Sequence, residues 1–458
     1  MHRKKDPEGS KPTLYFLCLS SFRLSRSSLL LYLGSLSGTP SVKPKTAIIH
    51  GVSVPDFSQE FFGGVPFAEP PVGYLNFSHP ALDLTRELLS SAQVTTGLLA
   101  LKEQAMHKTY DRSFLAWNNV VVQNDRTRIV SRSAERISKG SPTIFVNLNY
   151  RLGPFGFPRG SEARLRGVLN IGNKEILDAL TWVQENIEAF GGDKDKVTVF
   201  RVSAGENVLS ELLLDPNFNL ARAVIYESGS PASNMLSDAS RREIDWQTFV
   251  SAVPKCSGVS EDDLLNAFGI HIQAEFPFAP IIDRPGGVIP DLRSKLYAQG
   301  RFARTPFITG TFLDELGLSL PCLVTWHSIL CDANRCKQQV TRVKAFGSVF
   351  ADRVQTDPPF LGIPHGCEIP YLFGSLPDEQ ASIFARTLID YWISFAASLD
   401  PNDNLEKTSR PTWSQYTTSS KSVMQPERAN LAMIPDTLRM QQITYLIDMH
   451  RPLIIRIG

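Results

Sequence analysis

Ser203 lies where a serine could act as a nucleophile, on a turn between an apolar strand and an apolar helix. The strand is predicted at 197–200, where β-branched and aromatic residues follow one another. The helix is predicted from the helical spacing of apolar residues at 208–213. A serine on such a sharp turn needs small residues two positions away on either side. Gly205 meets this requirement, whereas Arg201 does not.

The partners that a serine nucleophile needs are an imidazole to take its proton and a carboxylate to orient that imidazole. In proteins whose nucleophilic serine lies on such a strand-to-helix turn, the three catalytic residues occur along the chain in the order serine, acid, histidine. Ser203, Glu315 and His365 satisfy this order, and glycine and proline flank the histidine. The order is weak evidence by itself, because eight histidines and 46 acidic residues make some such trio inevitable. The alternatives are a helix-capping role for the serine and surface or hydrogen-bonded roles for the competing histidines, which are His79, His107, His271 and His327.

The segments around these residues predict a parallel sheet with helices between its strands. Apolar strands are expected at 143–150, 197–200 and 223–226, and an amphipathic helix is expected over 173–190. Strand, helix, strand, helix, strand is the pattern of βαβ units. Ligands bind at the carboxyl ends of the strands in such sheets, which is where Ser203 lies. The fold class expected is therefore α/β, with a mostly parallel central sheet flanked by helices.

Two later segments extend this pattern. Residues 307–310 are expected to end a strand just before the loop that contains Glu315. Residues 381–397 are expected to form a helix with a wide apolar face, because Phe384, Leu388 and other apolar residues recur at helical spacing.

Composition limits the classes of function. The 458 residues are 42% hydrophobic and 20% charged, which is ordinary for a globular protein with a sizeable core. A formal net charge of +1 indicates no basic surface for nucleic acid. No uninterrupted apolar run reaches the roughly 20 residues of a membrane-spanning helix. Because no internal repeat or low-complexity tract divides the chain, we expect one domain over 45–458.

The first 44 residues are expected to be a leader outside that domain. Their start is basic, and two short apolar pieces at 14–22 and 29–33 are separated by Arg23 and Arg26. A secretory signal has one continuous apolar core of roughly 7–15 residues. A weak signal peptide and a disordered leader are therefore both open interpretations.

The six cysteines do not define a metal site. Cys322, His327, Cys331 and Cys336 are close in sequence, but their spacing fits no paired C-x-x-C zinc site. We therefore expect no metal. A disulfide within this group is expected if the protein is exported, and free thiols are expected if it is not.

Several separated segments resemble the type-B carboxylesterase and lipase family, which includes the cholinesterases, and especially its fungal lipase-like branch. They occur in the family's order and cover most of the chain from about residue 45 to the end. The segments that carry the resemblance are FFGGVPFAEPPVG, FVNLNYRLGPFGF, ALTWVQENIEAFGGDKDKVTVF, YESGSP, FAPIIDRPGGVIP, FITGTFLDELG, LGIPHGCEIPYLFG and DYWISFAASLDPN.

The resemblance implies an α/β-hydrolase fold and hydrolysis of carboxylic esters through an acyl-enzyme, without metal or organic cofactor. It implies that Ser203 is the nucleophile, Glu315 the orienting acid and His365 the base. It also implies that Ala204 gives a backbone N–H to the oxyanion hole. The substrates implied are small-molecule or lipid esters. The family resemblance suggests secretion, while the interrupted leader leaves a cytoplasmic location open.

The chain departs from the family at the nucleophile turn. The family has G-E-S-A-G there, whereas residues 201–205 read R-V-S-A-G and are followed by Glu206. Arg201 is expected to collide with the elements that close around the turn and to mis-aim Ser203. Nothing over 82–141 resembles the His-Gly-Gly-Gly stretch that supplies further oxyanion donors, and loss of one such donor costs about 10²–10³ in kcat. The alternative function is therefore a catalytically impaired or inactive relative that binds apolar ligands or partners without turnover.

Overall fold

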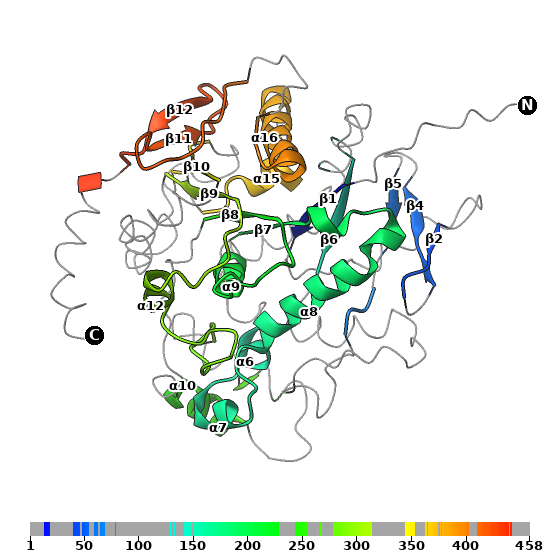
Figure 1. Cartoon of the computed structure of the whole chain (residues 1–458), viewed down its shortest axis with the longest axis vertical. Helices are drawn as coiled ribbons and strands as arrows, with labels where there is room; N and C mark the ends of the chain where they lie inside the picture. Colours follow the sequence, from blue (N-terminus) through cyan, green and yellow to red (C-terminus); the bar gives the residue numbers. More distant parts are fainter. Residues whose placement is uncertain are drawn as a thin grey trace, which may run out of the picture.

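The structure is a computed structural model of the whole chain (Figure 1). The residues that it describes are 13–18, 40–45, 48–54, 59–62, 65–68, 78, 129, 132, 142–148, 150–202, 204–228, 243–253, 263, 266–267, 278–313, 344–352, 362–363, 365–373, 376, 378–402, 410–438 and 440–441.

An eight-stranded sheet lies at the centre of the described part of the chain (Figure 1). Its strand order is β12-β11-β10-β9-β8-β7-β1-β6, and all of its pairings are parallel except that of β11 with β12. The expected mostly parallel sheet is therefore confirmed. Its strands are β1 (Thr13–Cys18), β6 (Thr143–Asn147), β7 (Thr198–Val202), β8 (Ala223–Glu227), β9 (Phe307–Phe312), β10 (Ala345–Phe350), β11 (Ser422–Gln425) and β12 (Ala432–Pro435).

Strand β1 lies inside this sheet, between β6 and β7. Cys18 is in parallel register with Asn147 on one side and with Phe200 on the other. These residues belong to the segment that the sequence analysis expected to be a leader outside the domain. The difference arises because a six-residue apolar run reads equally well as a buried strand or as part of a leader. Removal of β1 would leave the edge strand β6 without its partner in the sheet and would leave backbone N–H and C=O groups on one side of β7 unpaired.

Two layers of helices cover the two faces of the sheet (Figure 1). Val199 and Val224 belong to the core beneath the first layer, whereas Phe200 and Ile225 belong to the core beneath the second. This alternation follows from the strand geometry, in which successive side chains point to opposite faces. The first layer contains α8 (Ile171–Asn186) and α9 (Ala204–Leu212), and the second contains α15 (Ile369–Phe373) and α16 (Glu379–Ser398).

The two predicted long helices are confirmed with small changes at their ends. α8 is followed by a 3₁₀ turn, η4 (Ile187–Phe190), so that the two elements together cover the expected range. Gly191 ends the turn with a φ of 85°, a left-handed conformation that suits glycine. α16 begins after Asp378, whose side chain accepts a hydrogen bond from the backbone N–H of Ala381.

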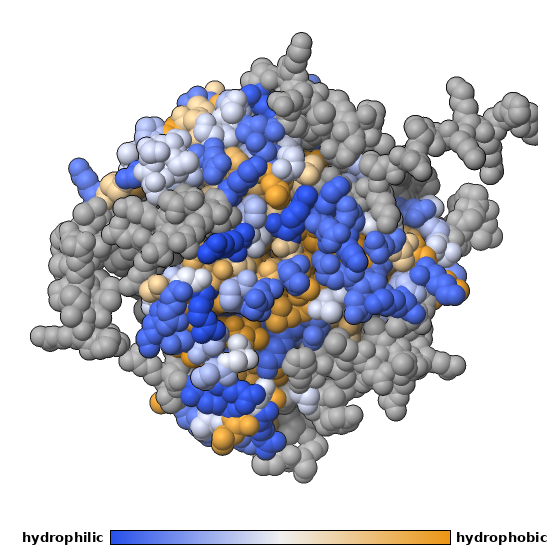
Figure 2. Space-filling model, in the orientation of Figure 1, coloured by the Kyte–Doolittle hydropathy of each residue, from blue (hydrophilic) through white to orange (hydrophobic). Residues whose placement is uncertain are grey.

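The remaining elements lie around these layers. In the space-filling view, apolar side chains reach the surface near the centre, where α8 and α9 lie, with hydrophilic side chains around them (Figure 2). Among the described residues, no helix combines the length and the apolar character needed to cross a membrane. The remaining elements are β2 (Ser41–Val42), β3 (Ile49–His50), β4 (Val52–Val54), β5 (Gln59–Phe61), α6 (Gly153–Gly156), α7 (Gly160–Leu165), η5 (Lys194–Lys196), α10 (Glu243–Ala252) and α12 (Arg293–Ala298).

Candidate active site

The candidate catalytic residues follow strands that end at one edge of the sheet. β7 ends one residue before Ser203, β9 ends three residues before Glu315, and β10 ends 15 residues before His365. Strands β7 to β10 are mutually parallel, so the chain leaves all of them at the same edge. Ser203 and Glu315 themselves lie outside the described residues, so the structure does not test their roles. The topology nevertheless brings their neighbours together.

His365 is half-buried beside the end of β9. Its ring centroid lies 6.1 Å from that of Phe312, with an angle of 80° between the ring planes. Phe312 is the last residue of β9 and is almost fully buried. After the turn that contains His365 the chain enters α15, where Phe373 stacks on Phe200 of β7 with 5.8 Å between ring centroids. The histidine segment is therefore packed against both the strand before the predicted acid and the strand before the predicted nucleophile.

Ala204 is the first residue of α9. The first N–H groups of an α-helix have no acceptor within the helix, and they lie at the positive end of its dipole. This position suits the role of oxyanion donor, which the family resemblance implied for the backbone N–H of Ala204. Its role stays a prediction.

Arg201 is buried in the end of β7 and leaves the strand intact. Its side chain is 2% exposed, and its backbone is in regular register with Tyr226 of β8. The guanidinium lies 5.0 Å from the ring centroid of Tyr150, within range of a cation–π interaction. A Cβ added at Gly205 would lie 2.5 Å from Arg201 Nε. The small residue at 205 thus makes room for the arginine, and the elements on both sides of the turn form; whether Ser203 is mis-aimed stays a prediction.

Glu211 connects α9, the helix that follows the nucleophile turn, to the helices α8 and α12. Its Oε2 accepts a hydrogen bond of 2.9 Å from Asn173 Nδ2 of α8, and its Oε1 lies 3.1 Å from Arg293 Nη2 of α12. Burial raises the pKa of Glu211 to about 7, although Arg293 and the hydrogen bond from Asn173 act in the opposite direction. The sequence analysis missed this group. Its signal was an acidic residue inside the apolar run that follows Ser203.

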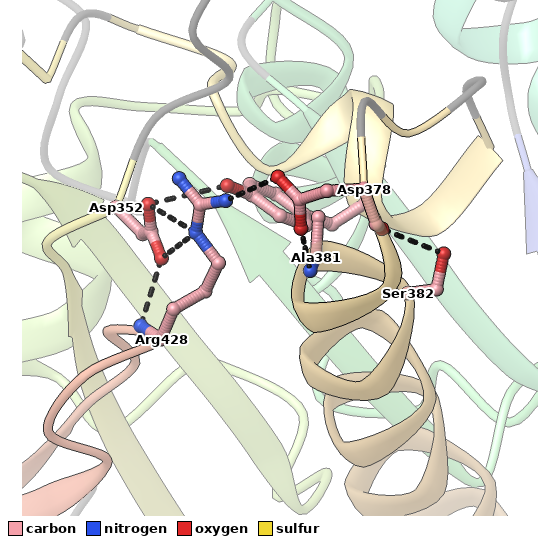
Figure 3. A network of polar contacts seen from close by, with 6 residues as sticks. Asp352, Asp378, Ala381, Ser382 and Arg428 are labelled. Carbon is pink, nitrogen blue, oxygen red and sulfur yellow. Dashed lines mark hydrogen bonds and ion pairs between the residues drawn. The ribbon is translucent and has the colours of Figure 1, made fainter.

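A second polar cluster, the Asp352 network, consists of Asp352, Tyr371, Asp378 and Arg428 (Figure 3). Tyr371 belongs to α15, the helix that follows the turn with His365. Asp352 lies two residues after the end of β10 and is 7% exposed. Its carboxylate accepts hydrogen bonds from the Tyr371 hydroxyl at 3.2 Å and from the backbone N–H and Nε of Arg428 at 2.7 and 2.9 Å. Arg428 Nη1 also lies 3.3 Å from Asp378 Oδ2, and Figure 3 shows the guanidinium between the two carboxylates. The sequence analysis missed this cluster too.

Metal ligation has no support within the described residues, where no three His, Cys, Asp or Glu side chains form a group that could hold an ion. Cys322, His327, Cys331 and Cys336 lie outside those residues. Cys367, two residues after His365, is buried.

Comparison with known proteins identifies the fold and the class of protein. The crystal structure of Aspergillus niger EstA matches with a TM-score of 0.68 and 19% identity, over 91% of this chain and 99% of EstA. Lipase 1 of Geotrichum candidum is 25% identical over 553 residues, which cover 89% of this chain and 96% of the lipase. Secreted lipase 1 of Botryotinia fuckeliana is 29% identical over 342 residues, which cover 59% of this chain and 58% of the lipase. The predicted α/β-hydrolase fold is confirmed.

The family is shown by a model of the carboxylesterase family that matches residues 132–329 and 322–445. The chain belongs to the carboxylesterase family, as the sequence resemblance implied. Its class of function is the hydrolysis of carboxylic esters, and its substrates are small-molecule or lipid esters. The alignment with the Geotrichum lipase is longer than the 458 residues of this chain, so the lipase contains internal segments that this chain lacks.

Proposed function

We propose that this chain hydrolyses carboxylic esters through an acyl-enzyme formed on Ser203, with His365 as general base and Glu315 as the acid that orients it. The observation that carries the proposal is the contact between the rings of His365 and Phe312. The contact holds the His365 ring beside the last residue of β9, three residues before Glu315. Strand β7, which ends one residue before Ser203, ends at the same edge of the sheet.

The reaction that this arrangement supports has two stages. The Ser203 hydroxyl attacks the ester carbonyl carbon while His365 takes its proton, and the carbonyl oxygen becomes an oxyanion. The N–H of Ala204 donates to that oxyanion, and Glu315 stabilises the imidazolium. The tetrahedral species expels the alcohol, which takes the proton from His365. Water then attacks the acyl-enzyme with His365 again as base, and the acid and the free serine are released.

We also propose that the substrates include lipid esters and that the protein acts outside the cell. The similarity to two proteins named as lipases, one of them named as secreted, supports both points. Because β1 pairs with β6 and β7, we expect export to leave residues 13–18 attached to the domain. The mass of the protein recovered from the medium tests this, because removal of residues 1–44 would contradict it.

A second candidate function is binding of apolar ligands or partners without turnover. The observation that favours it is the burial of Arg201 at a position of the nucleophile turn where the family has glycine. The absence of a glycine-rich oxyanion stretch over 82–141 of the sequence points in the same direction.

Labelling by a fluorophosphonate probe and hydrolysis of a short-chain aryl ester distinguish the two functions. The wild-type protein is compared with Ser203→Ala and with Ser251→Ala, which alters a serine on the outer surface of α10. Catalysis predicts labelling and turnover that are lost in Ser203→Ala and kept in Ser251→Ala. Absence of both signals from the wild type would favour the non-catalytic function, and equal signals from wild type and Ser203→Ala would exclude Ser203 as the nucleophile.

A further inference from the structure

We propose that Asp352 is a positioning residue for His365, acting through its contacts with Tyr371 and Arg428. This proposal rests on the proposed function, in which His365 is the general base.

The first observation is that Asp352 and Tyr371 bracket the histidine. Asp352 lies 13 residues before His365, and Tyr371 lies six residues after it. The hydrogen bond between the Tyr371 hydroxyl and Asp352 Oδ1, at 3.2 Å, joins the two ends of the segment that carries His365. Closing a segment at its ends reduces the conformations open to the residues between them. The sheet positions Asp352 directly, because β10 ends two residues before it.

The second observation is that Arg428 fixes the carboxylate from the opposite side. Arg428 lies between β11 and β12, and both its backbone N–H and its Nε donate to Asp352 Oδ2, at 2.7 and 2.9 Å. Such charge-assisted bonds are stronger than neutral ones and restrict orientation. Its Nη1 reaches Asp378, the capping residue of α16 (Figure 3). The carboxylate that accepts the hydrogen bond from Tyr371 is therefore held by the sheet and by the loop of the β11–β12 hairpin. Arg428 connects it to α16.

The third observation is that the rings of Tyr371 and His365 rest on one aromatic pair. Phe312 and Phe350 have ring centroids 5.6 Å apart. Tyr371 lies 5.7 Å from Phe350, and His365 lies 6.1 Å from Phe312. Because packed rings resist independent displacement, a shift of Tyr371 would be transmitted to the place where His365 lies. Burial and the Asp352 carboxylate raise the pKa of the Tyr371 hydroxyl well above its usual range, so this group remains a donor.

The alternative is that the network stabilises the fold without affecting the histidine. The chain offers a matched control in Asp390 of α16, which forms an ion pair with Arg132 at 2.7 Å. The side chains of Asp352 and Asp390 are 8% and 10% exposed, so the two pairs have similar burial. A variant of each removes one negative charge from one buried ion pair.

The experiment compares the full-length wild type with Tyr371→Phe, Asp352→Asn and Asp390→Asn. It measures kcat and KM for an aryl ester, the pH profile of kcat and the melting temperature. A displacement of about 1 Å at a catalytic group can cost about 10²-fold in rate. We expect kcat to fall about tenfold in Tyr371→Phe and about 10²-fold in Asp352→Asn, with KM within about twofold and the His365-dependent limb of the pH profile shifted. Asp390→Asn is expected to lower only the melting temperature.

Each outcome decides the proposal. Tyr371→Phe removes a single oxygen atom, so it provides the result if Asp352→Asn does not fold. A wild type with Ser203-dependent turnover whose kcat and pH profile are unchanged by Tyr371→Phe would overturn this proposal and leave the proposed function standing. A wild type without labelling or turnover would overturn the proposed function and this proposal with it.

Discussion

The helix that follows Ser203 and the segment that carries His365 are both held by buried carboxylates, but in different surroundings. On the nucleophile side, Glu211 and Arg293 are 0% and 6% exposed, and their contacts connect regular helices. On the histidine side, Arg428 is 23% exposed, and its contacts connect a loop, a strand end and a helix cap. Helices packed on a sheet are already positioned by their apolar faces, whereas a loop is not. We therefore expect changes on the nucleophile side to act mainly on stability and changes on the histidine side mainly on turnover.

Removal of β1 is the largest change on the nucleophile side, because β1 pairs directly with β7. We expect deletion of residues 1–20 to abolish soluble, folded protein, since the backbone groups of β6 and β7 then lose their partners inside the sheet. Deletion of residues 1–10, which ends before β1 begins at Thr13, is the matched control and should fold normally. Soluble yield and circular dichroism of the two truncations provide the measurement. Normal folding of the longer truncation would show that β1 is dispensable.

Glu211 should make stability depend on pH. Its pKa is about 7 in the folded chain and 4.5 as the ordinary value, so between these values the folded state binds more protons than the unfolded state. Stability contributed by this group is therefore complete below pH 4.5 and is lost as the pH rises through 7, to a total of about 3 kcal/mol.

The variant Glu211→Gln stays neutral and should remove the part of this slope between pH 6 and pH 7. Between pH 4.5 and pH 6 the slope should become smaller but not vanish, because burial also raises the pKa of Asp283, to about 6. Urea unfolding at several pH values measures both parts. An unchanged slope above pH 6 in Glu211→Gln would contradict the assignment to Glu211.

A substitution at Gly205 tests how the nucleophile turn accommodates Arg201. A Cβ at this position would lie 2.5 Å from Arg201 Nε, so we expect Gly205→Ala to destabilise the fold by about 1–3 kcal/mol through overpacking. In the Arg201→Gly background the same change should be neutral or stabilising, because alanine favours a helix more than glycine does. Denaturant unfolding of the four proteins of this double-mutant cycle measures the coupling. Equal effects of Gly205→Ala in both backgrounds would rule out the steric explanation.

Local patterns in the sequence predicted the elements that position the site, but not the polar groups that support it. The strand at 197–200 and the helix that ends at Gly191 follow from apolar periodicity and from a left-handed glycine. β1 was assigned to a leader because a short apolar strand carries no pattern that distinguishes it from one. The contact of Asp352 with Arg428 joins residues 76 positions apart and depends on the placement of two strands, which no local pattern encodes.

A substitution at Asp378 tests whether the positioning of His365 depends on the whole Asp352 network or only on Asp352 and its direct contacts. Its side chain caps α16 by accepting from the N–H of Ala381 at 2.7 Å, and it also contacts Arg428 at the more exposed end of the Asp352 network. Loss of such a cap costs about 1 kcal/mol, so Asp378→Ala should lower the melting temperature. Since Asp352 keeps its own contacts with Arg428 and Tyr371, kcat should remain within about twofold of the wild type. Asp378→Ser, which can still cap the helix, should recover most of the stability, and a fall in kcat as large as that of Asp352→Asn would extend the positioning role to Asp378.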